Sequence, residues 1–128
     1  MHDVGRGDVV HVDLNGAQGD EQANDKNTGR RICVIVQNDI GNMNASHTIV
    51  VSVITDDGRK RLPTHVAVKM GDGGLHKDSI VKCEQIRSVD WSRMEKSSAN
   101  GIRVMGRLSP EAMEKIDDAL KVSLGIRC

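Results

Sequence analysis

The sequence predicts a mainly β domain with one C-terminal α-helix, built as a small, strongly curved antiparallel sheet or barrel. Apolar residues recur with a period of two through most of the chain, the connectors are rich in Gly and Asn, and a strong helical spacing occurs at the C-terminal end. Strands in succession followed by one helix are typical of a curved sheet with a packed helix. The length of 128 residues suits a single domain over residues 1–128.

Six strands are expected, at residues 8–14, 32–36, 48–55, 66–68, 79–89 and 102–108. In the first strand, Val10, Val12 and Leu14 share one face and alternate with a more polar face. The run 32–36 is apolar without interruption, which is typical of a central strand that is buried on both faces.

The C-terminal helix is marked at both of its ends. Ser109, Pro110 and Glu111 have the order of an N-cap, a first helical position and an acidic first turn. Apolar residues then recur at spacings of three and four, at Met113, Ile116, Leu120 and Leu124. Gly125 follows as a stop signal. A short helical turn is also expected around residues 90–96.

The composition limits the classes of function. The chain has 38% hydrophobic and 28% charged residues and a formal net charge of zero, so no global field attracts a polyanion. Trp91 is the only aromatic residue, which disfavours binding by rows of stacked aromatic side chains. No apolar run approaches a membrane span, and the N-terminal residues lack a signal-peptide pattern, so we expect a cytoplasmic protein.

The cysteines and histidines form no recognisable site in the sequence. Cys33 and Cys83 lie in apolar runs, where cysteine commonly acts as a small core residue. The three cysteines have neither the even number nor the spacing of a disulfide framework. No pair of histidines has the spacing of metal ligands, so we expect no metal and no other cofactor.

Six sequence motifs resemble those of the MazF/PemK family of bacterial toxin endoribonucleases and occur in the family's order. They are RGDV at 6–9, GDEQ at 19–22, Arg31 before VQND at 36–39, Thr55, LPTHV at 62–66 and EQIR at 84–87. The resemblance implies an SH3-like barrel, a symmetric homodimer and metal-independent cleavage of single-stranded RNA to 2′,3′-cyclic phosphate and 5′-hydroxyl ends. It also implies a cognate antitoxin whose acidic, disordered tail occupies the RNA groove.

The resemblance assigns catalytic roles to Arg31, Thr55 and Glu21. The guanidinium of Arg31 is a fixed fork of donors for phosphate oxygens, and the family implies that it also moves protons. Thr55 can add a hydroxyl group, and Glu21 is a loop carboxylate suited to proton transfer or RNA contact. Counting back from Gln37 selects Arg31 over Arg30. We expect Arg31 and Thr55 at loop mouths outside the core.

Two features depart from the family pattern. Ile32 follows the arginine where the family usually has proline, and residues 23–30 make the preceding loop longer than usual. The lost proline frees the backbone at the start of the strand. His11 is a further catalytic candidate, because some relatives have a catalytic histidine at this place and histidine titrates near neutral pH.

RNA contacts are expected from polar and basic residues in or beside the motifs: Gln22, Arg30, Asn38, Arg59, Arg61, His65 and Gln85. Arg59 and Arg61 would give a neutral chain a local positive patch for phosphate. The amide of Gln85 has two equally supported uses, which are contact with a base edge and a hydrogen bond between strands.

Two alternatives to an endoribonuclease stay open from the sequence. One is a toxin on the same fold that binds and inhibits DNA gyrase, and the other is an inactive module that binds RNA or the antitoxin. Arg31 with Thr55 favours cleavage, because a gyrase binder needs no phosphate site. A homodimer is expected from the apolar surface of the helix and of residues 80–83.

Overall fold

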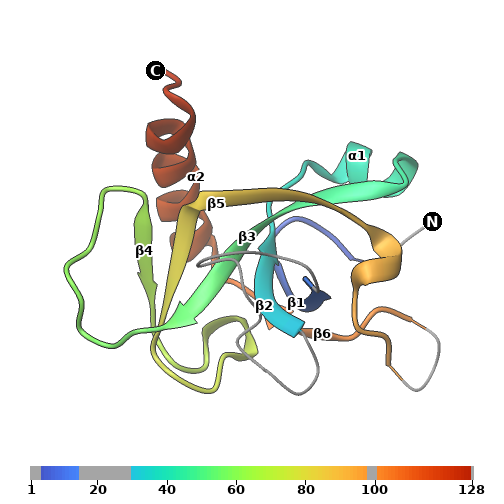
Figure 1. Ribbon diagram of the computed structural model, residues 1–128, viewed down its shortest axis with the longest axis horizontal. Helices are drawn as coiled ribbons and strands as arrows, with labels where there is room; N and C mark the ends of the chain where they lie inside the picture. The colour runs from blue at the N-terminus through green and yellow to red at the C-terminus, as the bar shows by residue number, and fades with distance from the viewer. Residues whose placement is uncertain (1–3, 15–29, 98–100, 128) are drawn as a thin grey trace.

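The computed structural model describes residues 4–14, 30–97 and 101–127 (Figure 1). Its strands are β1 (Asp8–Asp13), β2 (Arg30–Ile35), β3 (His47–Thr55), β4 (His65–Val68), β5 (Ser79–Asp90) and β6 (Val104–Arg107). Its helices are α1 (Asp39–Asn44), α2 (Pro110–Leu124) and the short 3-10 turns η2 (Asp72–Gly74) and η3 (Trp91–Arg93). The six predicted strands and the predicted helix are therefore confirmed. Among the described residues, no helix has the length and hydropathy that a bilayer span requires.

The strands form one antiparallel sheet in the order β4-β5-β3-β2-β1-β6. Side chains alternate between its two faces. Val9, Val34 and Val51 are aligned across three strands and belong to the first of two apolar cores. Val10 and Cys33, one residue along, belong to the second core. The strand β2 is therefore buried on both faces, as its uninterrupted apolar run predicted.

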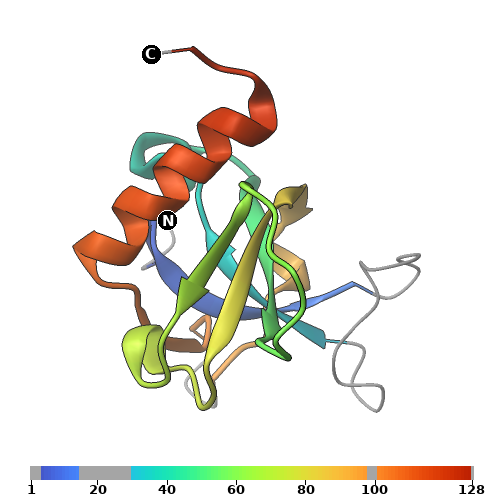
Figure 2. The ribbon, with the colours of Figure 1, turned by 90° about the vertical axis from the view of Figure 1, so that its left-hand side faces the viewer.

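The helix α2 covers the first core and lies along one side of the sheet (Figure 2). Ile116 is fully buried in this core, and Ala112 and Ala119 are buried on the same side of the helix. The predicted N-cap is present, since the Ser109 hydroxyl oxygen accepts a hydrogen bond from Ala112 N at 3.2 Å. Gly125 ends the helix with a left-handed backbone at φ 70°.

Trp91 anchors the second core from η3. The indole is buried, and its Nε1 donates a hydrogen bond to the carbonyl oxygen of Ala45 at 2.9 Å. Asp90 caps the turn by accepting a hydrogen bond from Ser92 N at 2.9 Å. The helical turn predicted around residues 90–96 is thus confirmed as η3.

Close backbone packing brings η2, which follows β4, against β6 at the other edge of the sheet. A Cβ atom at Gly106 would stand 2.7 Å from the carbonyl carbon of Gly73. One at Gly74, where φ is +75°, would stand 2.2 Å from the carbonyl oxygen of Met105. Only glycine permits this approach, which closes the curved sheet into a small barrel.

The helix α1 differs from the prediction, which gave residues 38–47 as a polar connector. Asn38 begins the helix by accepting a hydrogen bond from Gly41 N at 2.8 Å. Behind it, buried Asn42 accepts hydrogen bonds from Thr48 Oγ1 at 2.6 Å and from Gln37 Nε2 at 3.1 Å. Polar contacts hold this helix, so the segment has no helical apolar period to detect.

We expect Gly106→Ala to destabilise the protein by about 1–3 kcal/mol, because the added methyl group would push the backbone of Gly73 away from β6. Gly101→Ala is the matched control, since the nearest atom to its added Cβ is Ser97 Oγ at 3.9 Å. We expect the control to change the free energy of unfolding by less than about 0.5 kcal/mol. Urea denaturation followed by circular dichroism measures both, and equal losses would contradict the close approach.

Candidate functional site

Arg31 lies within β2, where it pairs with Val12 of β1 and is 5% exposed. The alternation of the strand puts it on the same face as Cys33, which is the face of the second core. The expectation that Arg31 lies at a loop mouth outside the core is therefore wrong. Because the sheet buries both faces of β2, an arginine at this position is enclosed by the strands beside it.

The groups that act on Cys33, two residues after Arg31 in β2, indicate which charges lie in this part of the sheet. Cys33 is aligned with Ser52 of β3, which gives its thiol a hydrogen bond, and the charges of Arg31 and Arg87 both act on it. Burial outweighs these effects and raises the pKa of Cys33 to about 12. Two guanidinium groups thus lie within electrostatic reach of one thiol. The name arginine cluster is used below for Arg31, Arg87 and Gln85, which lies two residues before Arg87 in β5.

The strand β5 is irregular where it carries Gln85. Its pairing with β3 jumps from Ile86 opposite Val51 to Lys82 opposite Ser52, so Gln85 has no partner in the ladder. The side-chain Oε1 of Gln85 is buried and accepts no hydrogen bond from any described residue. Since a buried acceptor without a donor costs free energy, this oxygen suits a donor from a bound molecule. This oxygen therefore does not make the hydrogen bond between strands that was the other predicted use of the Gln85 amide.

Thr55, exposed at the end of β3, opens onto a pocket of about 290 Å³. The pocket is lined by His11, Arg30, Ile32, Val53, Ile54, Thr55, Leu75, His76, Lys77 and Ser79. Val53 and Leu75 belong to the first core, so the pocket lies at an open end of that core and is called the mouth pocket. Thr55 and His11 thus meet there with Arg30, while Arg31 faces the other side of the sheet.

Glu95 lies beside the mouth pocket and was not predicted from the sequence. Its carboxylate is 3.4 Å from His11 Nδ1, 3.7 Å from Arg30 Nη1 and 3.4 Å from Arg103 Nη1. It therefore compensates the charge of Arg30, which lies on the face of β2 opposite to Arg31. The segment after η3 carries no motif, and only the tertiary structure brings this carboxylate to β1 and β2.

Arg59 and Arg61 lie on the exposed loop after β3, each beside a carboxylate. Arg59 Nε is 2.6 Å from Asp57 Oδ2, and Arg61 Nη2 is 2.8 Å from Asp56 Oδ2. A hydrogen bond from Gly58 N, followed by that from Arg61, lowers the pKa of Asp56 below its ordinary value. The predicted positive patch is therefore balanced locally by aspartates.

His65 connects its own motif to β5. Its Nδ1 accepts a hydrogen bond from Leu62 N at 3.2 Å, so Nε2 carries the proton and donates to Glu84 Oε2 at 2.9 Å. Thr64 Oγ1 donates to the other oxygen of Glu84 at 3.0 Å. Burial pushes the pKa of Glu84 up, but these hydrogen bonds outweigh it and lower the pKa. The histidine thus has a clear structural role.

The remaining candidates lie away from both regions. Asn38 is beyond the far end of β2 from Arg31, where its side chain caps α1. Glu21 and Gln22 lie outside the described residues. Cys83 is a buried free thiol like Cys33, so the core role predicted for both is confirmed. Within the described part of the chain, no group of three or more His, Cys, Asp or Glu side chains could hold a metal ion.

Known proteins are similar to this chain in sequence and in fold. A family model described as PemK-like, MazF-like toxin of type II toxin-antitoxin system matches residues 5–124. Endoribonuclease MazF of Staphylococcus epidermidis is 40% identical over 124 residues, which are 96% of this chain and 92% of that protein.

Solved structures of the family have the same architecture. A mycobacterial endoribonuclease in complex with its cognate antitoxin matches with a TM-score of 0.73 at 24% identity, covering 98% of each chain. The Mycobacterium tuberculosis toxin MazF-mt6 matches with a TM-score of 0.71 at 15% identity, covering 94% of this chain and 99% of that chain. These matches agree with the expected SH3-like barrel. Because the family model spans nearly the whole chain, the protein belongs to the PemK-like, MazF-like toxins of type II toxin-antitoxin systems.

Proposed function

We propose that this protein is a toxin endoribonuclease that cleaves single-stranded RNA without a metal ion. In this reaction a 2′-hydroxyl attacks the adjoining phosphate, and the products carry a 2′,3′-cyclic phosphate and a 5′-hydroxyl. The observation that carries the proposal is the arginine cluster, where the charges of two guanidinium groups act on one buried thiol and Gln85, two residues before Arg87, has a buried amide oxygen without a donor. Family membership supports the toxin role.

Arg31 is proposed to stabilise the negative charge that develops on the phosphate oxygens. Its planar fork of donors matches two of these oxygens at once. The burial of Arg31 strengthens this attraction, because less water screens the charge. The charge of Arg87 acts on the same thiol as that of Arg31, and Arg87 is proposed to add its charge at the phosphate.

The reaction also needs one group that takes the proton of the 2′-hydroxyl and one that gives a proton to the leaving 5′-oxygen. We assign proton transfer to Glu21 and Arg31. Thr55 is proposed to donate a neutral hydrogen bond to the same phosphate, which would lie at the ends of the strands because Thr55 and Arg31 face opposite sides of the sheet. His11 is the second candidate for proton transfer, from the mouth pocket that it shares with Thr55.

Gln85 is proposed to read a base of the RNA. Its buried Oε1 would accept a hydrogen bond from the exocyclic amine of adenine, cytosine or guanine, while uracil has no such donor. Arg59 and Arg61 would exchange their aspartate partners for phosphates of the flanking strand, at a gain that salt weakens.

The proposed partners are a second copy of the chain and a cognate antitoxin. A homodimer would place the basic loops of both subunits beside one groove. An acidic, disordered tail would occupy that groove by imitating phosphate, with Arg31, Arg59 and Arg61 as its anchors.

We expect cleavage of a long single-stranded RNA to proceed in EDTA, because the arginine cluster supplies the charge stabilisation that a metal would otherwise give. Mapping the new 5′ ends with and without prior kinase treatment shows whether they are hydroxyl groups. Loss of cleavage in EDTA with recovery on adding magnesium would contradict the mechanism. Inhibition of DNA gyrase without RNA cleavage would favour the alternative toxin, and neither activity would favour the inactive module.

We expect Arg31→Ala to reduce the rate of cleavage by about 10³-fold or more, which is roughly 4 kcal/mol of transition-state stabilisation. Arg31→Lys keeps the charge and much of the volume but should not restore the rate, because an ammonium lacks the fork. Thr55→Ala should cost about 10- to 10²-fold, since it removes one neutral donor. Single-turnover cleavage of a short RNA gives each rate.

Arg30→Ala is the matched control for these variants, because it removes the neighbouring arginine on the opposite face and should have a mild effect. Arg31 is buried, so thermal unfolding of every variant is measured before the rates are compared. Full activity of Arg31→Ala together with an inactive Arg30→Ala or His11→Ala would move the catalytic centre to the mouth pocket.

We expect Gln85→Met to raise the free energy of unfolding by about 1 kcal/mol while it weakens base discrimination, because it removes a buried acceptor that no donor satisfies. Gln37→Met is the matched control: its amide donates to Asn42 Oδ1 and to the His47 carbonyl, both at 3.1 Å. The control should lose about 1–3 kcal/mol. Urea denaturation and cleavage-site mapping measure the two effects, and a destabilised Gln85→Met would overturn the assignment.

A further inference from the structure

The strand β4 lies at one edge of the sheet, so its outer side is paired with no strand of the described part of the chain. On its inner side, Cys83 N of β5 donates to the Thr64 carbonyl at 2.9 Å. Bonded positions alternate along an antiparallel pair, so Val66 also bonds toward β5, while Ala67 directs its N–H and carbonyl outward. Ala67 is exposed and has a short side chain. The outer edge of β4 thus presents a donor and an acceptor that an added strand can use.

A groove lies between this edge and α2, which runs beside β4 (Figure 2). Its volume is about 380 Å³, and it is called the edge groove. Its lining comes from the loop before β4, from β4 and from one face of α2, and includes Arg61, Ala67, Lys115, Asp118, Ala119 and Val122. Val122 is 56% exposed although it is aliphatic, so covering its side chain stabilises a complex. A groove beside a sheet edge suits an extended peptide that joins the sheet as a further strand.

The charges of the edge groove favour an acidic peptide. Among the described residues that line it, two carry a permanent positive charge, Arg61 before β4 and Lys115 on α2, and one is a carboxylate, Asp118. Arg61 lies 2.8 Å from Asp56, whereas Lys115 is exposed and has no carboxylate partner in the described part of the chain. An acidic side chain in the groove would therefore meet Lys115 without displacing another carboxylate.

We propose that the edge groove binds an extended, acidic segment of a partner protein, which adds to β4 as a further strand. The N–H of Ala67 would donate to a carbonyl of the segment, and the carbonyl of Ala67 would accept from one of its N–H groups. Lys115 would bind an acidic side chain of the segment, and Val122 would contact an aliphatic one. The groove lies on the side of the sheet that α2 covers, while Arg31 faces the second core, so docking needs no RNA.

The first experiment titrates the synthetic peptide acetyl-Glu-Val-Leu-Val-Glu-amide into the isotope-labelled full chain and follows the backbone amides by NMR. We expect saturable shifts at Ala67 and along the face of α2 that lines the groove. Hydrogen exchange of the Ala67 N–H should be at least about tenfold slower in the complex, because this group becomes bonded. The same peptide with both Glu residues changed to Lys should bind about tenfold more weakly. Unchanged exchange at Ala67, or equal binding of both peptides, would overturn the proposal.

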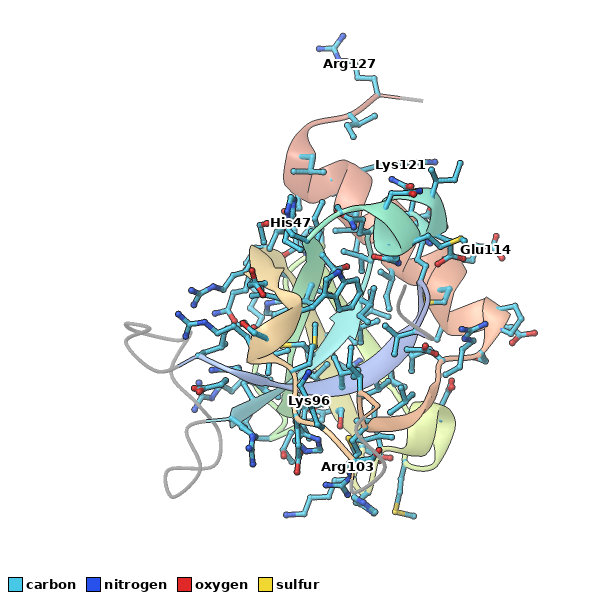
Figure 3. All side chains as sticks on the ribbon, turned by 90° about the vertical axis from the view of Figure 1, so that its right-hand side faces the viewer. His47, Lys96, Arg103, Glu114, Lys121 and Arg127 are labelled. Carbon is cyan, nitrogen blue, oxygen red and sulfur yellow. The ribbon has the colours of Figure 1, made fainter. Side chains whose placement is uncertain are left out.

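Two variants separate the backbone pairing from the charge. Ala67→Pro removes the outward N–H but no bond to β5, and edge strands tolerate proline at such positions, so we expect a folded protein that binds the peptide about tenfold more weakly. Lys115→Glu should also weaken binding about tenfold. Lys96→Glu, the same change at an exposed position after η3, is the matched control and should bind like the parent (Figure 3). Full binding by Lys115→Glu would overturn the proposal even if Ala67→Pro fails to fold.

The same variants test the other possible occupants and sites. Loss of peptide binding in Arg31→Ala, with full binding by Ala67→Pro, would place the peptide at the arginine cluster and overturn the proposal. Sedimentation should give the parent and Ala67→Pro the same oligomeric state. Dissociation of Ala67→Pro into smaller species would show that a second copy of the chain occupies the edge of β4, and this result would also overturn the proposal.

Discussion

The burial of β2 on both of its faces is the constraint on which the rest of the structure depends. Cys33, Val34 and Ile35 each face one core or the other, and the same alternation continues to the less buried start of the strand. The side chains of the consecutive residues Arg30 and Arg31 therefore lie on opposite faces of the sheet. Arg31 enters the cluster with Arg87, and Arg30 reaches the mouth pocket and Glu95. One dipeptide thus supplies two chemically different regions.

The fold could be predicted from the sequence where an apolar period exists. Strands buried on one or both faces repeat every second residue, and α2 repeats at three and four, so all of them leave a local signal. The helix α1 leaves none, because a cap from Asn38 and the buried amide of Asn42 hold it. The contact of η2 with β6 also could not be predicted from the sequence, because it joins glycines that are far apart in the chain.

The residues of the candidate site also divide into those that the sequence could predict and those that it could not. Arg31, Thr55 and Gln85 could be found because they lie in sequence motifs. The face of the sheet on which each side chain lies could not, because it depends on the strand register and a shift of one residue moves the side chain to the opposite face. Glu95 could not be found, because its contacts with His11 and Arg30 join distant segments of the chain. The balance of Arg59 by Asp57 was open to prediction, since the two residues are neighbours in one loop.

The two buried thiols have a consequence for the setting in which such a toxin acts. Peroxides and alkylating agents react with thiolates, and burial raises the pKa of both Cys33 and Cys83 to about 12. At neutral pH nearly all of each cysteine side chain is therefore in the protonated, unreactive thiol form, and its burial shields it from solvent. Cys33 lies on β2, two residues from Arg31 and opposite Ser52 of β3, so an oxidised sulfur there would disturb the packing of the second core. The burial of Cys33 therefore shields the sulfur inside the arginine cluster from oxidants that react with exposed thiolates.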